Sequence, residues 1–531
     1  MAVVLIAVIY LYISPYCKYV IQGNSRPADA VESFKDDWYL IGGFSGEAGE
    51  EFSFLKQNNR NLSTDIKGYF INDTIYCFVP QNTNVSRLRA SFTFDGKVSV
   101  DNKLQISGLS SLIFTDTVVY SVKNGPTTKN YSVIILKSEL PTLQIDTYDE
   151  ERVLAKVRYV GGTLRLYDTE SGYAQQVLPV EIRVRGNSTA SLPKLPYKFK
   201  LDSAKSLSGL TPSTDYTLLA NYYDPTMTRN TLAFAIAEHL GMDFVPESHM
   251  VDVIINGEYC GVYCLTTQVD VSSASVDITP ITESDTSGEA LTGGYLLELE
   301  TRIYDDMTNA FFTSSTIPVR IKSPSLPTKE QTEYIQNYLN EFESCLYSED
   351  FTYNGKSLEE YIDFESFAAM YWTNEIMKNT DFPVPMSYFV YKDRGGVLSA
   401  GPVWDFDIAA GNIMERPDAM DPTQWLSTDT TWYGRLLENE DFNRCVRDMY
   451  YENKAWITAL PQYTDELISS VEPVQNNNFI RTYIGLNERL FSTEDNDFYK
   501  DVSFLEEYLT LRLEWIAQNV DDLENRVVTT E

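Results

Sequence analysis

Two carboxylates stand two residues apart near the end of the sequence's folded body. Asp405 and Asp407 follow an apolar, strand-like run from 397 to 403. In an extended segment alternate side chains share one face, so both carboxylates would point the same way. A divalent cation between them would relieve their repulsion, and Asn412 could add an amide oxygen as a further ligand. The alternative is a solvated Asp pair after a buried strand, because this spacing alone is a weak pattern.

A third carboxylate, Asp381, stands before the preceding strand. That strand covers 387–392, and the turn at 393–396 leads into the segment that ends at Asp405. The pattern predicts a hairpin with carboxylates at both ends of its mouth. Kinases divide such a pair between two tasks, in which one Asp orients the acceptor hydroxyl and a later one holds Mg²⁺.

Length and charge limit the elements that could position these residues. The chain has 531 residues, enough for two to four domains, and a formal net charge of −34. Such an acidic surface repels nucleic acid and anionic membranes, so neither is expected as a partner. Any nucleotide site must therefore be locally basic or loaded with metal. With only two histidines, His239 and His249, a His-based triad or zinc site is not expected.

The first residues form an almost wholly apolar run, Met1 to Ile13, followed by Pro15. This run is shorter than a bilayer-spanning helix, and it favours a signal sequence or N-terminal membrane anchor over residues 1–22. We therefore expect an extracytoplasmic protein, anchored or secreted, that meets the membrane only through this segment. The alternative is a buried first strand. Residues 23–60 read as a linker.

Short β-rich runs separated by Asn, Gly, Pro and Asp turns fill residues 61–138. They predict a small β-sandwich that resembles the immunoglobulin-like modules of bacterial surface proteins. No constellation of catalytic residues lies in it. A spacer or adhesive role is the expectation.

Residues 139–531 begin with strands and, after Pro324 and Pro327, continue with apolar residues at helical spacing. The fold class is therefore α+β. A local basic patch is predicted where Arg185 precedes the strand that carries Lys198 and Lys200, although an exposed amphipathic hairpin would give the same pattern. Further along, Glu298 and Glu300 share one face of a buried strand.

Several motifs occur in a fixed order along this part of the chain. They include the turn Asn221–Asp224 followed by Arg229 and Asn230, an Asn-Gly hairpin turn at 256–257, and the segment 404–407. From Asp224 a helix is predicted to run to Gly241. Together the motifs resemble the CotH atypical protein kinases, over about 390 residues.

The resemblance implies a two-lobed, kinase-like domain that uses ATP and Mg²⁺ to phosphorylate a protein on Ser or Thr, as a monomer. It implies the following site: Asp381 as catalytic residue; Arg185, Lys198, Lys200, Glu298 and Glu300 around the nucleotide; Asp405, Asp407 and Asn412 around the metal. One departure is Ser387, where family members often carry Asn as a metal ligand. The alternative function is a non-catalytic surface, spore-coat-like or carbohydrate-associated binding protein that keeps the fold.

Overall fold

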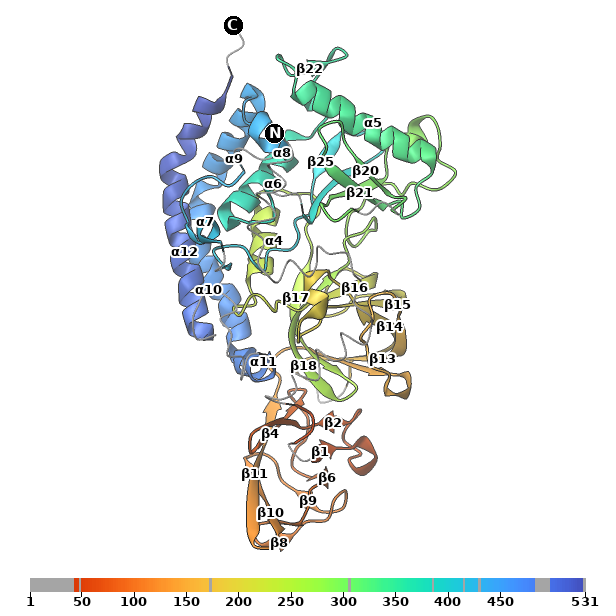
Figure 1. The fold of residues 1–531 in the computed structure, drawn as a ribbon, viewed down its shortest axis with the longest axis vertical. Helices are drawn as coiled ribbons and strands as arrows, with labels where there is room; N and C mark the ends of the chain where they lie inside the picture. The colour runs from red at the N-terminus through yellow and green to blue at the C-terminus, as the bar shows by residue number, and fades with distance from the viewer. Residues whose placement is uncertain are drawn as a thin grey trace.

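The computed structural model describes residues 43–46, 49–170, 174–303, 307–383, 386–413, 416–427, 431–482 and 497–528. The predicted signal or anchor segment, 1–22, lies outside these residues. Within them, no helix is both long and apolar enough to cross a membrane. Figure 1 shows an N-terminal β unit at one end, a barrel in the middle, and a second sheet with helices at the other end.

The N-terminal unit contains a six-stranded sheet, a three-stranded sheet and a strand pair. In spatial order the first is β3 (Tyr69–Ile71), β4 (Thr74–Val79), β11 (Thr127–Lys137), β10 (Val118–Asn124), β7 (Lys97–Val100) and β8 (Lys103–Leu104). The second is β2 (Ile66–Lys67), β1 (Glu51–Phe54) and β6 (Ser91–Thr93), and β5 (Leu88–Arg89) pairs with β9 (Ser111–Leu112). One core joins the two larger sheets, as in the contact of Phe52 with Tyr120. The unit therefore includes β1, upstream of the predicted start at residue 61.

The next seven strands close into a barrel. Around it they are β12 (Thr142–Thr147), β13 (Val160–Tyr167), β14 (Gln176–Val184), β15 (Tyr197–Lys205), β16 (Ser213–Leu219), β18 (Glu258–Thr267) and β17 (Ser248–Ile255). The closure between β12 and β17 is parallel. The predicted Asn-Gly turn joins β17 to β18, with positive φ at both Asn256 and Gly257. This confirms the hairpin and its turn chemistry.

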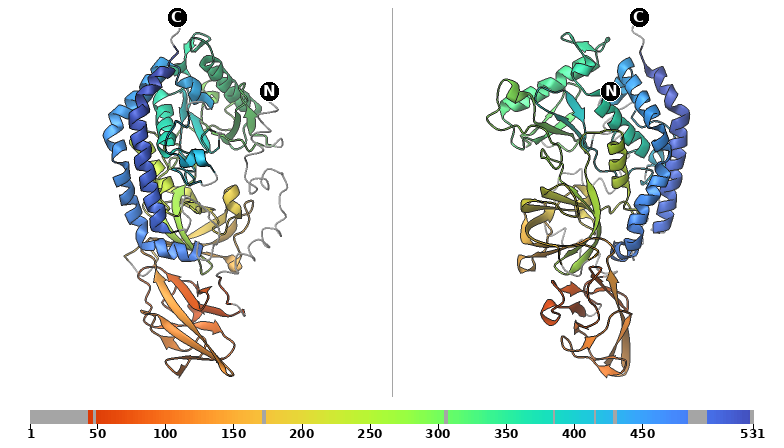
Figure 2. Two further views of the ribbon diagram at one scale, coloured as in Figure 1. Left: turned by 60° about the vertical axis from the view of Figure 1, so that its left-hand side comes forward. Right: turned by 180° about the vertical axis from the view of Figure 1, so that it is seen from behind.

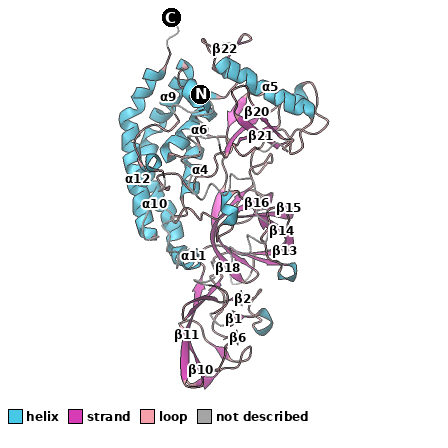
Figure 3. Cartoon of the chain, viewed as in Figure 1, coloured by secondary structure: helices cyan, strands magenta, loops and turns pink. Residues whose placement is uncertain are grey.

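The rest of the chain combines a five-stranded sheet with helices (Figure 3). The sheet order is β20 (Ala310–Phe312), β21 (Pro318–Ser323), β19 (Tyr295–Leu299), β24 (Tyr388–Lys392) and β25 (Leu398–Ala400), and β22 (Thr352–Tyr353) pairs with β23 (Lys356–Ser357). The helices are α4 (Arg229–His239), α5 (Lys329–Leu346), α6 (Phe364–Met377), α7 (Pro417–Met420), α8 (Thr431–Leu436), α9 (Glu440–Thr458), α10 (Leu460–Val471), α11 (Gln475–Thr482) and α12 (Phe498–Asn519). The α+β class predicted from the sequence is confirmed.

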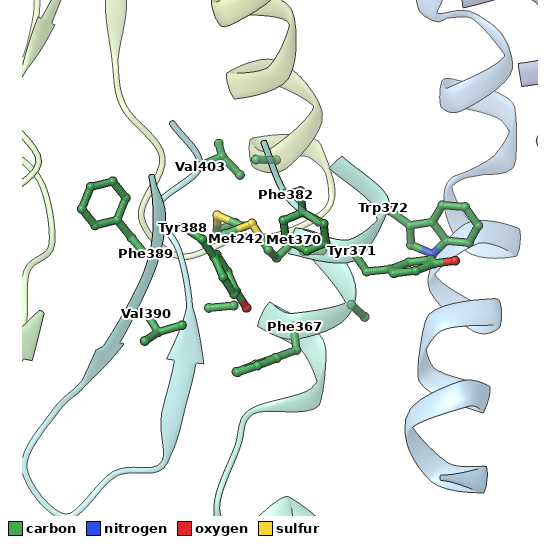
Figure 4. Packing of buried hydrophobic residues seen from close by; sticks show 14 of the residues in the cluster. Met242, Phe367, Met370, Tyr371, Trp372, Phe382, Tyr388, Phe389, Val390 and Val403 are labelled. Atoms are coloured by element: carbon green, nitrogen blue, oxygen red, sulfur yellow. The ribbon is translucent and has the colours of Figure 1, made fainter. Parts of the chain in front are cut away.

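Helix α6 is the centre of the largest core, because nearly every residue along it is buried. In Figure 4, Met370 of α6 lies with Phe382 and Tyr388, while Trp372 points to the far side of the helix. The Trp372 indole N–H donates a 2.7 Å hydrogen bond to the carbonyl of Val446 in α9. The helix is thus fixed on both sides, and so is the chain that leaves its C-terminus.

Helix α12 fastens the end of α6. The Arg512 guanidinium makes a 2.6 Å ion pair with Glu375, and both side chains are fully buried. The same guanidinium donates to the carbonyls of Pro422 and Gln424. Paired and fully hydrogen-bonded, this buried charge is stable where it lies, whereas loss of either partner would be costly. Figure 2 shows the long C-terminal helices running beside both the barrel and the upper sheet.

The N-terminal unit and the barrel share a buried contact. Phe78 of β4 stacks on Tyr259 of β18, with ring centroids 3.9 Å apart. The Tyr259 hydroxyl and the Ser138 hydroxyl both donate to the buried carboxylate of Asp252. Polar and aromatic contacts therefore connect the two units.

Candidate functional site

The segment that carries Asp405 and Asp407 is a turn. The predicted hairpin is present, with β24 paired to β25, but β25 ends at Ala400 and Asp405 has a φ of +71°. The expectation that both carboxylates project from one face of a strand is therefore wrong. A left-handed residue at this point reverses the chain direction instead of continuing the pleat.

Helix α4 holds this turn in place. The Asn230 side-chain oxygen accepts a 2.8 Å hydrogen bond from the backbone N–H of Phe406. The neighbouring Arg229 donates through Nε to the carbonyl of Ala409, at 3.0 Å. Both side chains are buried. The turn between the two carboxylates is thus positioned by residues about 180 positions earlier in the chain.

The start of α4 differs from the sequence prediction. The helix begins at Arg229 and not at Asp224. The Asp224 carboxylate accepts from the Arg229 backbone N–H at 2.8 Å and from its guanidinium at 2.6 Å. Since Arg229 is fully buried, its charge needs a partner, and Asp224 provides it from the turn before the helix.

The end of α6 brings Asp381 to the same place. Lys378 takes a left-handed conformation that ends the helix, and its ammonium donates to three carbonyls of the segment 418–423. Burial and, after it, the negative charge of Asp405 raise the pKa of Asp381 to about 7. The structure therefore brings Asp381 and Asp405 together at the hairpin mouth.

Asp407 belongs to the same acidic group. Burial raises its pKa well above the usual range, and the charges of Asp405, Asp224 and Asp381 add to the rise. Within the described part of the chain no three Asp, Glu, His or Cys side chains gather into a ready cation site. A cation here would take its remaining ligands from phosphate oxygens and water, as Mg²⁺ commonly does.

Asn412 fits the expected role of a further oxygen ligand. Its side chain is fully buried, and its Nδ2 donates to the carbonyls of Tyr223 and Asp407. Its Oδ1 is buried and has no hydrogen-bond partner among the described residues. A buried amide oxygen without a donor is costly, and a cation would satisfy it. The donor set, two carboxylates and this amide, suits Mg²⁺.

Arg185 faces the acidic group from the barrel side. Its guanidinium lies over the ring of Trp404, 5.4 Å from the centroid. Burial lowers the pKa of Arg185, while the charges of Asp405 and Glu298 act in the opposite direction. The predicted nucleotide residue Arg185 is therefore close to the predicted metal residue Asp405.

Glu298 and Glu300 each hold a cation. Lys322 of β21 lies 3.1 Å from the Glu298 carboxylate, and Arg302 binds Glu300 through two bonds of 2.7 and 2.6 Å. The negative charges of Asp405 and Asp381 help to raise the pKa of Arg302, so its guanidinium lies near both carboxylates. Sequence reasoning did not identify Arg302. Its place two residues after a predicted site glutamate was the only available signal.

The two predicted lysines point elsewhere. Lys198 makes a 3.0 Å ion pair with Asp215 of β16, and Lys200 is exposed, over the ring of Tyr159. On β15 the residues that alternate with them fill the barrel core. The cations that act on Asp381 are Arg302 and Arg416.

A further lysine, Lys156, was missed because it lies in a segment without a motif. Its pKa is lowered by burial and then by the charges of Arg302, Arg183 and Arg185. A lysine whose pKa is lowered by three arginines lies within a cluster of positive charge. Lys156, Arg183, Arg185 and Arg302 therefore form a basic group, of which Arg185 and Arg302 lie near the carboxylates of the site.

Ser387, the departure from the family pattern, lies beside Asp405, the predicted metal ligand. Its hydroxyl donates a 3.3 Å hydrogen bond to Asp405 Oδ2.

Comparison with known proteins identifies the family. The profile described as "CotH kinase protein" matches residues 182–516, more than half of the chain. A search of curated proteins finds no match. A solved structure described provisionally as a glycoside hydrolase, from Bacteroides thetaiotaomicron, is 18% identical, with a TM-score of 0.13 over 25% of this chain. This chain spans about half (48%) of that protein's length, and so low a TM-score supports no argument about fold or activity. On the extent of the profile match, the chain belongs to the CotH kinase protein family.

Proposed function

We propose that this protein is an exported CotH-type kinase that transfers the γ-phosphoryl group of ATP to Ser or Thr hydroxyls of a protein substrate. The observation that carries the proposal is the hairpin of β24 and β25, with Asp381 before it and Asp405 after it, where the charge of Asp405 acts on Asp381. The barrel would form the nucleotide-covering lobe and the helical half the second lobe of a kinase-like pair.

The roles follow from position. Asp405, Asp407 and the Oδ1 of Asn412 would hold Mg²⁺, which when bound neutralises charge on the phosphates. Asp381 would accept a hydrogen bond from the acceptor hydroxyl and orient it, and its raised pKa suits proton transfer near neutral pH.

Phosphate recognition falls to the basic group. Arg185 and Arg302, with Lys156 behind them, would meet the phosphate oxygens, because arginine forks match phosphate geometry. Glu298 and Glu300 would hold Lys322 and Arg302 in position. A chain with a net charge of −34 repels an anionic nucleotide unless the site itself is positive, and these residues would supply that positive charge.

A second candidate is a non-catalytic binding protein that keeps the fold and the cation. The specific observation in its favour is Ser387, which donates to Asp405 where an amide ligand is common in the family. It would suit an exported protein outside the cell, where ATP is scarce.

Nucleotide binding and phosphoryl transfer separate the candidates. The full chain from residue 23 onward should bind Mg-ATP, measured by calorimetry, and should label a generic basic protein substrate with radioactive phosphate. Binding without labelling favours the second candidate. Absence of both binding and labelling would overturn the kinase proposal.

A further inference from the structure

A cleft lies outside the carboxylate site, between the barrel and the helices. Its volume is about 530 Å³, within the usual range of ligand pockets. One wall is the face of α4 that carries Thr231, Phe234 and Glu238, and the opposite wall is α10 with Leu467 and Ser470. The floor comes from the first residues of β17 and from the loop before them. None of the predicted nucleotide, metal or catalytic residues lines this cleft.

The lining combines apolar surface with negative charge. Its apolar members include Met227, Phe234, Met250, Leu467 and Val471. Three carboxylates, Asp168, Glu238 and Glu247, also line it together with His249, and no Lys or Arg is among the described lining residues. Glu247 is already bound to the backbone N–H and hydroxyl of Thr211, whereas Glu238 is exposed on α4. Opposite charge therefore favours a cation and disfavours an anion at this place.

A buried polar atom in the cleft is also without a partner. The hydroxyl oxygen of Ser208, a lining residue, is buried and makes no hydrogen bond among the described residues. Ser208 has a φ of +51°, in the left-handed region. A ligand with a hydrogen-bond donor, such as an ammonium group, would satisfy this oxygen.

One aromatic pair connects the cleft to the turn that carries Asp405 and Asp407. Phe234 packs against Trp404, with centroids 6.3 Å apart and ring planes 26° apart. The Arg185 guanidinium lies over the same Trp404 ring, and Trp404 directly precedes Asp405 in the chain. From the same helix, Asn230 holds the N–H of Phe406. A ligand packed against Phe234 would therefore contact α4 and restrain the Trp404 ring, both of which position the turn.

We propose that this cleft binds a small organic cation with an apolar body, and that its occupancy stabilises the turn that carries Asp405. The apolar body packs against Phe234 and Leu467, and the cationic group lies near Glu238 and Ser208. This inference goes beyond the proposed function, and it does not require that the protein bind ATP.

Binding is tested by calorimetry on the full chain from residue 23, without nucleotide. The probe is 4-phenylbutylamine, and its matched controls are 4-phenylbutanol and 4-phenylbutanoate. We expect saturable one-to-one binding of the amine that is about tenfold or more tighter than that of either control. Equal binding of the three compounds, or no binding of the amine, would overturn the proposal.

Two variants, each of which narrows the cleft from one of its opposite walls, test whether the amine binds in this cleft. Thr231→Trp on α4 and Ser470→Trp on α10 should each weaken amine binding about tenfold or more. If one of them fails to fold, the other decides, and amine binding that persists in a folded variant contradicts the location. Glu238→Gln should weaken binding about threefold, because an exposed charge pair contributes little. Glu514→Gln, an exposed glutamate of α12, is the matched control and should leave binding unchanged.

Coupling to the turn is read by hydrogen exchange. Amides of residues 404–410 should exchange more slowly with the amine bound, while those of β10 and β11 should not change. Unchanged exchange at 404–410 with the cleft saturated would disprove the coupling. Neither result depends on Mg-ATP, so failure of the kinase proposal remains distinguishable.

Discussion

Asn230 accepts a 2.8 Å hydrogen bond from the backbone N–H of Phe406, and both groups are buried. The two residues are 176 positions apart. Phe406 lies between the two carboxylates of the turn, so this bond, together with that from Arg229 to the carbonyl of Ala409, holds the turn against α4. The amide of Asn230 also donates to Asn221, which fixes which of its atoms faces the turn.

Replacing Asn230 with Ala should destabilise the protein by about 1–3 kcal/mol, because a buried N–H is left without an acceptor. Urea unfolding measures this loss. The matched control is Asn340→Ala, which removes a similar 2.8 Å bond to the backbone N–H of Ser314 at an exposed place. A control that costs as much as Asn230→Ala would show that burial of the bond is unimportant.

Asp405→Asn should abolish Mg²⁺-dependent nucleotide binding and leave the fold intact. The change removes a ligand charge and also relieves repulsion with Asp381 and Asp407. Asn is preferable to Ala because it tolerates the φ of +71° at this position. Calorimetric titration with Mg-ATP, beside a thermal melt, checks both parts. Asp202→Asn, on an exposed part of β15, is the control, and unchanged nucleotide affinity in Asp405→Asn would reject the metal assignment.

Asp381→Asn should slow phosphoryl transfer far more than it weakens ATP binding. Its carboxylate would orient the acceptor's hydroxyl, and general-base assistance commonly contributes about 10²- to 10⁴-fold in rate. Transfer rate and nucleotide affinity are measured on the same preparation. Parallel losses of both quantities would contradict the division of roles between Asp381 and Asp405.

Asp252 should make stability depend on pH. Burial raises its pKa from 3.8 to about 6, against the effects of the Ser138 and Tyr259 hydroxyls and of Lys194. Because the folded state binds this proton more tightly, its contribution to stability is complete below pH 3.8 and is lost as the pH rises through about 6.

Urea midpoints at pH 4, 5, 6 and 7, compared between the wild type and Asp252→Asn, isolate this contribution. The wild type should lose stability relative to the variant between about pH 4 and 6. The exposed Asp277→Asn is the control and should track the wild type. A constant difference between wild type and Asp252→Asn across the range would exclude the assignment.

Residues 139–531 should fold alone but melt at a lower temperature than the longer chain. Each part has its own core. In the fragment, however, Tyr259 would lack its stacking contact with Phe78, and Asp252 would lack the hydrogen bond from the Ser138 hydroxyl. Phe78→Ala in the longer chain should cost about 3–5 kcal/mol. Phe312→Ala, at a Phe that is 54% exposed, should cost much less. An insoluble fragment would mean that this boundary does not separate independent domains.

Local patterns predicted the local structure well. The hairpin around 256–257 follows from its turn chemistry, and the helical character of the chain after Pro327 follows from apolar spacing; the structure confirms both, the latter in α5, α6, α9 and α12. These features depend on residues within one or two turns of each other, so they are readable without the rest of the chain.

The basic group could not be predicted in the same way. Lys198 and Lys200 had the right residue type and spacing, but barrel closure turns that strand face toward Asp215 and Tyr159. Arg302 comes near Asp405 and Asp381, and Lys156 near Arg302, through long-range packing that leaves no periodic signal. The left-handed conformation of Asp405 could not be predicted either, because the turn is held by bonds to Asn230 and Arg229, far away in the sequence.

The closure of the barrel has a consequence for synthesis of the chain. β12 pairs with β17 and β16 pairs with β18, so the hairpin at 248–267 completes both sides of the barrel in one step. A nascent chain that has emerged only to residue 247 holds five strands in an open sheet with two unpaired edges. Such edges can join those of neighbouring nascent chains. Translation of these twenty residues therefore sets how long the protein is vulnerable to co-translational aggregation.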